Sequence, residues 1–151
     1  MVAAAGFNAD ASFIIGGQID TQPPRIYLVY PQGNYITTSE QTPFLQLGEA
    51  KYGKEILDRV VHAGMSLDEA ARCALVSLDS TMRSNATVGP PIEVLSYEKD
   101  SLRLDHYLCL REDDPYLLAL KKSWNERILE AFRGLPNFEW ESAGEKMGER
   151  G

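Results

Sequence analysis

The first stretches of apolar residues in the chain have the composition of β-strands. Residues 12–19 (SFIIGGQI) and 25–30 (RIYLVY) are rich in strand-forming side chains, and a proline pair separates them. Residues 31–34 (PQGN) have the composition of a turn, so that residues 35–40 (YITTSE) can return as a partner strand. The pattern predicts one strand followed by a β-hairpin.

From about residue 50 the apolar side chains recur with the period of an α-helix. Tyr52, Ile56 and Val60 predict a helix over residues 50–62, which Gly64 ends. Ser66 begins a second helix, because SLDE has the spacing of a capping box. An apolar stripe rich in small side chains is expected to pack this helix closely on a sheet or another helix: Leu67, Ala71, Ala74, Leu75, Leu78 and Met82.

The last third predicts two more strands and a third helix. Alternation over residues 92–97 and 102–110 indicates strands joined by a turn at 99–101. Pro115 follows two aspartates and marks the first turn of a helix that ends before Gly134. The polar, glycine-rich residues 136–151 are expected to form a disordered tail. Strands followed by a helix pair favour an α+β layered domain over a doubly wound parallel sheet.

Charge and composition narrow the classes of partner. Hydrophobic residues make up 44% and charged residues 25% of the 151, as in globular proteins, and the formal net charge is −7. Clustered Lys and Arg supply most affinity for phosphate backbones, so nucleic acid and anionic membrane surfaces are not expected partners. No apolar run has the length of a transmembrane helix. Cys73 and Cys109 are expected to be buried free thiols, which suits a cytoplasmic protein.

The chain has few residues that point to chemistry on their own. It contains no glycine-rich phosphate loop and no metal-ligand spacing, so neither a cofactor nor a metal is expected. Asp79 precedes Arg83 by four residues and is expected to form an ion pair. Ser84, Asn85 and Thr87 lie where the second helix meets the next strand. Local side-chain hydrogen bonds that end the helix account for them, and one wall of a reactive site is the alternative.

Several motifs carry a family resemblance. GGQI, PQGN, GEAKYGK and SLDSTMRSNATVGPP resemble the C-terminal half of bacterial proteasome-type peptidases, and the nearest match is the ancestral β-subunit (Anbu) family. The resemblance extends from about Phe7 to Phe132 and makes residues 1–135 the C-terminal part of a proteasome β-subunit-like domain. It implies part of the αββα sandwich of N-terminal-nucleophile hydrolases, with a helix pair on one face and a C-terminal helix.

The same resemblance implies how such a subunit hydrolyses peptide bonds. In this family the side chain of the first residue after processing is the nucleophile, and its own α-amino group, with a pKa of about 7.7–8.0, helps take the proton. A Lys and an Asp of the family's N-terminal half complete the centre. Met1-Val2-Ala3 offers no Thr, Ser or Cys, and Ser12 lies inside a predicted strand. We therefore expect no catalytic residue in these 151 residues and no activity from them alone.

The resemblance implies that residues supporting the active site are present in this chain. Proteasome β subunits often have Arg-Asp-x-x-Ser at the end of this helix, and the matching residues here begin at Arg83 and end at Thr87. Thr87 keeps the hydroxyl, whereas Ser84 replaces the carboxylate and can orient an amine but not hold an ammonium by charge. Gly48 matches a turn beside the active site, where a backbone N–H can help to bind an oxyanion. The expected site-supporting residues are thus Ser84, Asn85, Thr87 and Gly48.

Three functional interpretations follow. The first is a truncated proteasome-type peptidase subunit that acts on peptides or unfolded proteins within a homo-oligomer. The second is a non-catalytic assembly or interaction subunit of a proteasome-like oligomer, because missing strands would leave sheet edges and apolar faces bare. The third is an unrelated α+β module that binds a small molecule.

Overall fold

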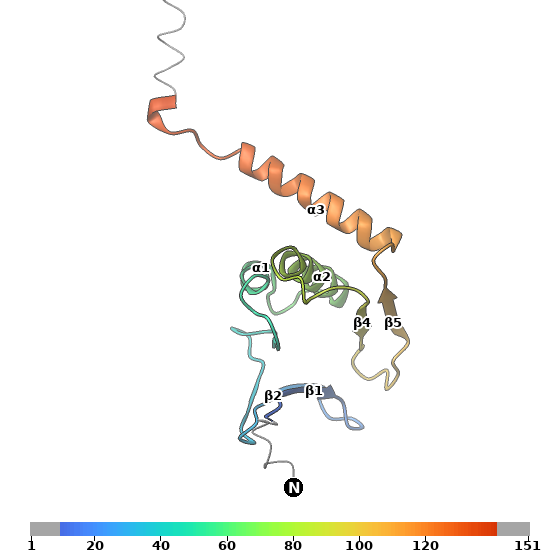
Figure 1. The fold of residues 1–151 in the computed structure, drawn as a ribbon. Coiled ribbons are helices and arrows are strands. Elements are labelled where there is room, and N and C mark those ends of the chain that lie inside the picture. Colours follow the sequence, from blue (N-terminus) through green and yellow to red (C-terminus); the bar gives the residue numbers. More distant parts are fainter. Residues whose placement is uncertain (1–9, 142–151) are drawn as a thin grey trace, which may run out of the picture.

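The computed structural model describes residues 10–141. Its elements form an α+β arrangement with antiparallel strands, as the sequence predicts (Figure 1). In chain order they are β1 (Phe13–Gly17), β2 (Arg25–Val29), β3 (Tyr35–Thr37), α1 (Lys54–Val60), α2 (Leu67–Ser84), β4 (Ile92–Ser96), β5 (His106–Leu110) and α3 (Pro115–Arg133).

The first sheet confirms the predicted strand and hairpin. β2 is its central strand, and both neighbours are antiparallel to it, with Ile15 opposite Tyr27 and Tyr27 opposite Thr37. Gly33 turns the hairpin at a φ of 85°, which glycine adopts without steric cost. The Tyr27 and Tyr35 rings meet edge to face at 5.3 Å, so a cross-strand aromatic pair supports this register.

The helix pair begins and ends at local signals. The predicted capping box of α2 is confirmed: Ser66 accepts from the Glu69 N–H, and Glu69 accepts from the Ser66 backbone. α1 is shorter than the predicted 50–62, because residues 51–53 form turns and Val61 is already extended. Ion pairs from Lys54 to Asp58 and from Arg59 to Glu55, both 2.6 Å, stabilise its exposed side.

The second sheet contains only the hairpin of β4 and β5. Val94 lies opposite Leu108, and the strand predicted over residues 102–110 begins only at His106. Leu102 has a φ of 49°, and the Ser101 hydroxyl donates to Glu98 O at 2.7 Å, so the chain bends here instead of extending the ladder.

A small core joins α2, β4, β5 and α3. Leu75, Ile92, Leu110 and Leu117 are its buried members, and Leu117 is fully buried. The predicted proline start of α3 is confirmed, with Asp114 capping the Tyr116 and Leu117 N–H groups. Figure 1 shows that α3 then runs away from the other elements.

The predicted stripe of α2 is only half correct. Leu75 and Met82 pack in the core, but Leu67, Ala74 and Leu78 are exposed. The buried positions of the helix are instead mostly small or polar: Cys73, Leu75, Ser77, Asp79 and Thr81. The reason is tertiary, because the helix is covered on the side of α1 and of the hairpin but not along the whole apolar stripe.

The expectation of two buried thiols is wrong for Cys109. Cys73 is buried, and burial raises its pKa, whereas Cys109 is exposed, although both are free. Cys109 lies opposite Glu93 on the face of the hairpin that points away from the core, and no described element covers that face.

The expected disordered tail lies mostly outside the described residues, which end at Glu141. In the described part the Phe138 and Trp140 rings stack at 4.5 Å.

Candidate active site

The segment that follows α2 is held by its own side chains. Asn85 leaves the helical conformation with φ −136° and ψ 105°, and its N–H donates to Thr81 O at 2.8 Å. Asn85 Oδ1 accepts from the Thr87 N–H at 3.0 Å and from Thr87 Oγ1 at 2.6 Å. These local bonds end the helix as expected. They also fix the Thr87 hydroxyl with its proton directed at Asn85, so its lone pairs remain free to accept a hydrogen bond.

Ser84 and Thr87 are both exposed, one at the last position of α2 and one in the following turn. A ligand or chain segment beside this turn would therefore meet two neutral hydroxyl groups.

The buried carboxylate of α2 does not belong to this surface. Asp79 is only 3% exposed and forms the predicted ion pair with Arg83, with Oδ2 to Nε at 3.1 Å. Its other oxygen lies 3.9 Å from Lys121 Nζ of α3. Because both of its oxygens face cations, Asp79 links α3 to α2.

Gly48 lies in a separate loop. Its φ of 88° favours glycine, and a side chain here would meet open space. The Lys51 N–H donates to Glu49 Oε1 at 3.0 Å, which holds the loop that leads to α1. Among residues 10–141, no hydrogen bond joins Gly48 to residues 84–87.

Gly53, which was not among the residues predicted for the site, connects the Gly48 loop to α2. A Cβ at Gly53 would lie 2.5 Å from Ser77 O and 2.9 Å from Thr81 Oγ1, and it would also meet Ser77 Oγ. The backbone before α1 therefore rests directly on α2 at Ser77 and Thr81, near the C-terminal end of the helix. The only signal in the sequence was the second glycine of GEAKYGK.

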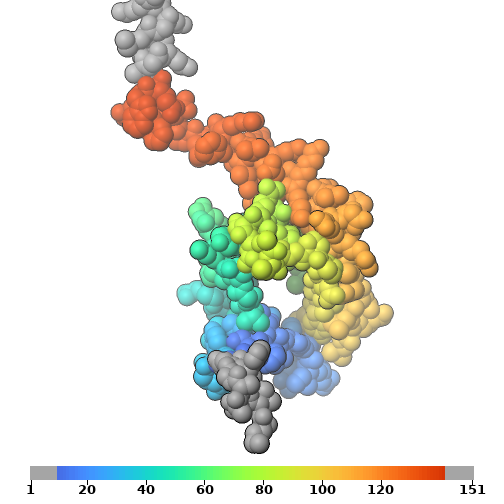
Figure 2. Space-filling view, in the orientation of Figure 1, coloured from blue at the N-terminus to red at the C-terminus, as the bar shows by residue number. Residues whose placement is uncertain are grey.

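A hollow separates the first sheet from α2 and the second hairpin. Figure 2 shows it as an opening ringed by segments from the N-terminal, middle and later parts of the chain. One cavity here has a volume of about 780 Å³, and its lining is largely apolar. The lining residues are Gly16, Gly17, Gln18, Pro24, Arg25, Ile26, Thr38, Leu67, Leu95, Tyr97, Leu102 and Leu104.

Gln18 bridges the hollow at one side. Its Oε1 accepts from Tyr97 Oη and from the Asp100 N–H, both at 2.8 Å, and its Nε2 donates to Asp100 Oδ1 at 2.6 Å. The GGQI motif thus carries the side chain that ties the end of β1 to the turn after β4.

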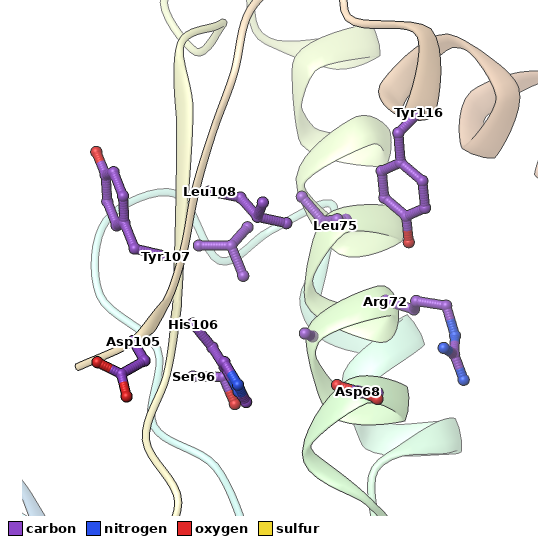
Figure 3. Close-up of a pocket in the computed structure, with 11 residues that line it drawn as sticks. Asp68, Arg72, Leu75, Ser96, Asp105, His106, Tyr107, Leu108 and Tyr116 are labelled. Carbon is purple, nitrogen blue, oxygen red and sulfur yellow. The ribbon is translucent and has the colours of Figure 1, made fainter. Parts of the chain in front are cut away.

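A second cavity, of about 480 Å³, lies between α2 and the hairpin (Figure 3). His106 and Leu108 point toward α2, whereas Tyr107 points to the opposite side of the strand. A hydrogen bond to the Glu93 carboxylate is the main cause that raises the pKa of Tyr107. Asp68 and Arg72 line the helix side of this cavity. The part of the chain that the structure describes holds no group of three or more potential metal ligands.

Within residues 10–141, no helix has the length and apolarity needed to cross a membrane.

Comparisons with known proteins identify the family. The family model for proteasome subunits matches residues 2–96, which is more than half of the chain. None of the curated proteins compared with the chain matches it.

Solved structures agree with this match over a longer stretch. Anbu from Yersinia bercovieri is 42% identical over 86% of this chain, with a TM-score of 0.83. Anbu from Hyphomicrobium sp. strain MC1 is 44% identical over 85% of the chain, with a TM-score of 0.82. The Anbu complex from Pseudomonas aeruginosa, solved as a helical assembly, is 47% identical over 89%, with a TM-score of 0.85. The matches span 55%, 55% and 56% of those chains, so this chain covers about half of their length. The chain belongs to the proteasome subunit family, and its fold is similar to that of Anbu.

Proposed function

We propose that these residues form the supporting part of a proteasome-type peptidase subunit, in which an N-terminal nucleophile hydrolyses peptide bonds of peptides or unfolded proteins. One observation carries the proposal: the chain superimposes over most of its length on Anbu but matches only about half of each Anbu chain. In this proposal the nucleophile belongs to the part of the family fold that these 151 residues do not match. The polypeptide made of these residues alone is then inactive. Its free cysteines suit the reducing cytoplasm, where we place the subunit.

The turn after α2 has a defined task in such a subunit. Thr87 Oγ1, whose proton is directed at Asn85, accepts a hydrogen bond from the α-amino group of the nucleophilic residue. Ser84 orients the same amine as a neutral neighbour. The Gly48 loop supplies a backbone N–H for the oxyanion of the tetrahedral intermediate. Asn85 does not touch the reacting atoms in this scheme and acts as a positioning residue for Thr87.

Complementation tests the proposal. The 151-residue polypeptide would be refolded together with the unmatched N-terminal portion of the Pseudomonas aeruginosa relative, and the turnover of fluorogenic peptides and of an unfolded protein would be measured. We expect turnover only from the mixture, and a loss of this turnover in Thr87→Val. A stable mixed complex in which Thr87→Val has no effect would contradict the assigned role of the turn.

A non-catalytic assembly subunit is the second candidate, and the hollow favours it. Its apolar lining and the free edges of two small sheets are surfaces that other chains can cover. In this alternative the polypeptide joins a proteasome-like homo-oligomer without supplying a reactive centre. A stable and monodisperse monomer in size-exclusion chromatography would exclude it.

A further inference from the structure

Asp79 is a buried carboxylate that cations from two different helices approach. It is 3% exposed and lies near the C-terminal end of α2. Its Oδ2 accepts a hydrogen bond from Arg83 Nε at 3.1 Å, and its Oδ1 lies 3.9 Å from Lys121 Nζ of α3. A buried charge is costly unless it is paired, so the fold is most stable when both cations stay beside this carboxylate.

Burial distinguishes this cluster from the ion pairs on the surface of α1. Lys54 and Asp58 form an exposed pair within one helix, and such pairs contribute little to stability. The contact between Asp79 and Lys121 is instead the only ion pair between α2 and α3 among residues 10–141. The buried carboxylate therefore constrains how the two helices lie relative to each other.

Arg83 carries this constraint to the candidate site. It directly precedes Ser84, which is the last residue of α2. The same end of the helix contains Thr81, whose carbonyl oxygen accepts from the Asn85 N–H at 2.8 Å. Asn85 in turn accepts from Thr87 Oγ1 at 2.6 Å. A shift of Arg83 would therefore move the hydroxyl groups of Ser84 and Thr87 together.

Lys121 comes from the part of α3 that is fixed on the rest of the molecule. Leu117, one turn earlier, is fully buried in the core that also contains Leu75 of α2. The Lys121 side chain is itself 25% exposed, so most of its stem is covered and its ammonium group is restricted to the neighbourhood of Asp79. The lysine thus approaches the carboxylate from an anchored position.

We propose that Asp79 is a positioning residue of the candidate site, which fixes the turn after α2 relative to α3 through Arg83 and Lys121. Asp79 does not touch the reacting atoms in this scheme, since its carboxylate is buried. The inference rests on the peptidase role proposed above, and it adds which buried group holds the two hydroxyls in place. Without Lys121 the buried charge is incompletely paired, and the end of α2 can relieve this by opening locally and admitting water.

Amide hydrogen exchange of the 151-residue polypeptide, followed by NMR, tests this coupling. In Lys121→Met we expect the amides of Asn85 and Thr87 to exchange about tenfold faster, because the end of α2 opens more often. The amide of Glu69, at the other end of the helix, should keep its rate. The matched control is Lys122→Met, which removes the next charge along α3 from a side chain that is 78% exposed.

The control variant is expected to show wild-type exchange throughout, and Lys121→Arg, which retains the charge, should also keep the wild-type rates at the turn. Unchanged exchange of the Asn85 and Thr87 amides in Lys121→Met would overturn the proposal. Equal acceleration at Glu69, or the same effect in Lys122→Met, would attribute the change to a general loss of stability and would overturn it too.

Kinetics of the complemented enzyme test the consequence for the site. Asp79→Asn and Lys121→Met should each lower kcat by about tenfold with little change in KM, as for lost positioning of a catalytic group. Because both variants break one unit, the double variant should be no slower than Asp79→Asn alone. An inactive mixture would count against the proposed function, while the exchange measurement, which needs no hydrolysis, still decides the coupling. Losses that multiply in the double variant, or that appear in KM alone, would contradict a positioning role for Asp79.

Discussion

The side chains of Gln18 and Asp100 meet across 82 positions of sequence, with Gln18 Nε2 2.6 Å from Asp100 Oδ1. The same glutamine accepts from Tyr97 Oη and from the Asp100 N–H. One amide therefore joins the sheet that begins the chain to the turn of the second hairpin, on either side of the hollow. Gln18 and Tyr97 both line the cavity between the two sheets.

Removal of this bridge should loosen the contact between the two sheets. Gln18→Ala breaks four side-chain hydrogen bonds, three to Tyr97 and Asp100 and one to Asp20 O. We expect the free energy of unfolding to fall by about 1–2 kcal/mol, since the group is partly exposed. Urea denaturation followed by circular dichroism measures the change. Gln22→Ala is the control, because the Gln22 side chain makes no hydrogen bond within residues 10–141. Equal losses in the two variants would argue against the bridge.

Gly53 should not tolerate a side chain. In Gly53→Ala the new Cβ would lie 2.5 Å from a backbone oxygen of α2, which cannot rotate away, so we expect a loss of about 1–3 kcal/mol. The unfolding midpoint in urea provides the test. Gly17→Ala serves as the matched control, because no atom lies within 4 Å of a Cβ built at Gly17. A Gly53→Ala protein as stable as the wild type would show that α1 does not rest on α2 as described.

The capping box of α2 should give a defined pH dependence. Hydrogen bonds from Ser66 lower the pKa of Glu69 in the folded protein. A lowered pKa stabilises the fold above the unfolded value of about 4.3, and this contribution is lost as the pH falls through the folded value. Glu69→Gln should therefore be less stable than the wild type at pH 6, and the difference should shrink as the pH falls below about 4.

Ser66→Ala provides the matching test of that cause. Without the serine hydroxyl the carboxylate loses its side-chain partner, so the pH-dependent difference made by Glu69→Gln should become smaller in a Ser66→Ala background. An undiminished difference in that background would attribute the effect to another group.

The two thiols should differ sharply in reactivity. Cys109 is exposed on the bare side of the hairpin, whereas burial both hides Cys73 and raises its pKa. A thiol reagent at pH 7.5 should modify Cys109 rapidly in the native protein and Cys73 only after unfolding. Cys109→Ser should remove the fast phase, and a fast phase that persists in this variant would mean that α2 is not packed as described.

Local signals in the sequence were sufficient for much of the fold. The hairpin around Gly33, the capping box at Ser66 and the proline start of α3 each depend on neighbours within a few residues, and all three are confirmed. The early end of α1, the irregular path through Leu102 and the exposed Cys109 depend on which surfaces other segments cover. Periodicity reveals which face of an element is apolar, but it does not reveal whether another segment covers that face.

In the candidate site, too, the sequence predicts contacts between near neighbours but not contacts between distant segments. The hydrogen bonds of Asn85 to its neighbours follow from residue types and spacing, and the structure contains them. The close approach of Gly53 to α2 joins segments about 25 positions apart, and the second glycine of GEAKYGK was its only signal in the sequence. The roles of Ser84, Thr87 and Gly48 rest on family resemblance and remain predictions.

Asn85 offers a test of the site that is separate from stability. In a complemented enzyme, Asn85→Ala frees the Thr87 hydroxyl to rotate, and we expect kcat to fall by about tenfold with little change in KM, as for lost positioning of a catalytic group. Asn85→Asp retains an acceptor for the Thr87 hydroxyl and should recover part of the rate. A change in KM alone would assign Asn85 to substrate binding.

The central claim is that these 151 residues support a nucleophile that they do not contain. Peptide turnover by the purified 151-residue polypeptide, alone and at high concentration, tests it most directly. The account predicts no hydrolysis above that of a mock purification, in the wild type and in Thr87→Val alike. Hydrolysis that copurifies with the polypeptide and disappears in Thr87→Val would contradict it.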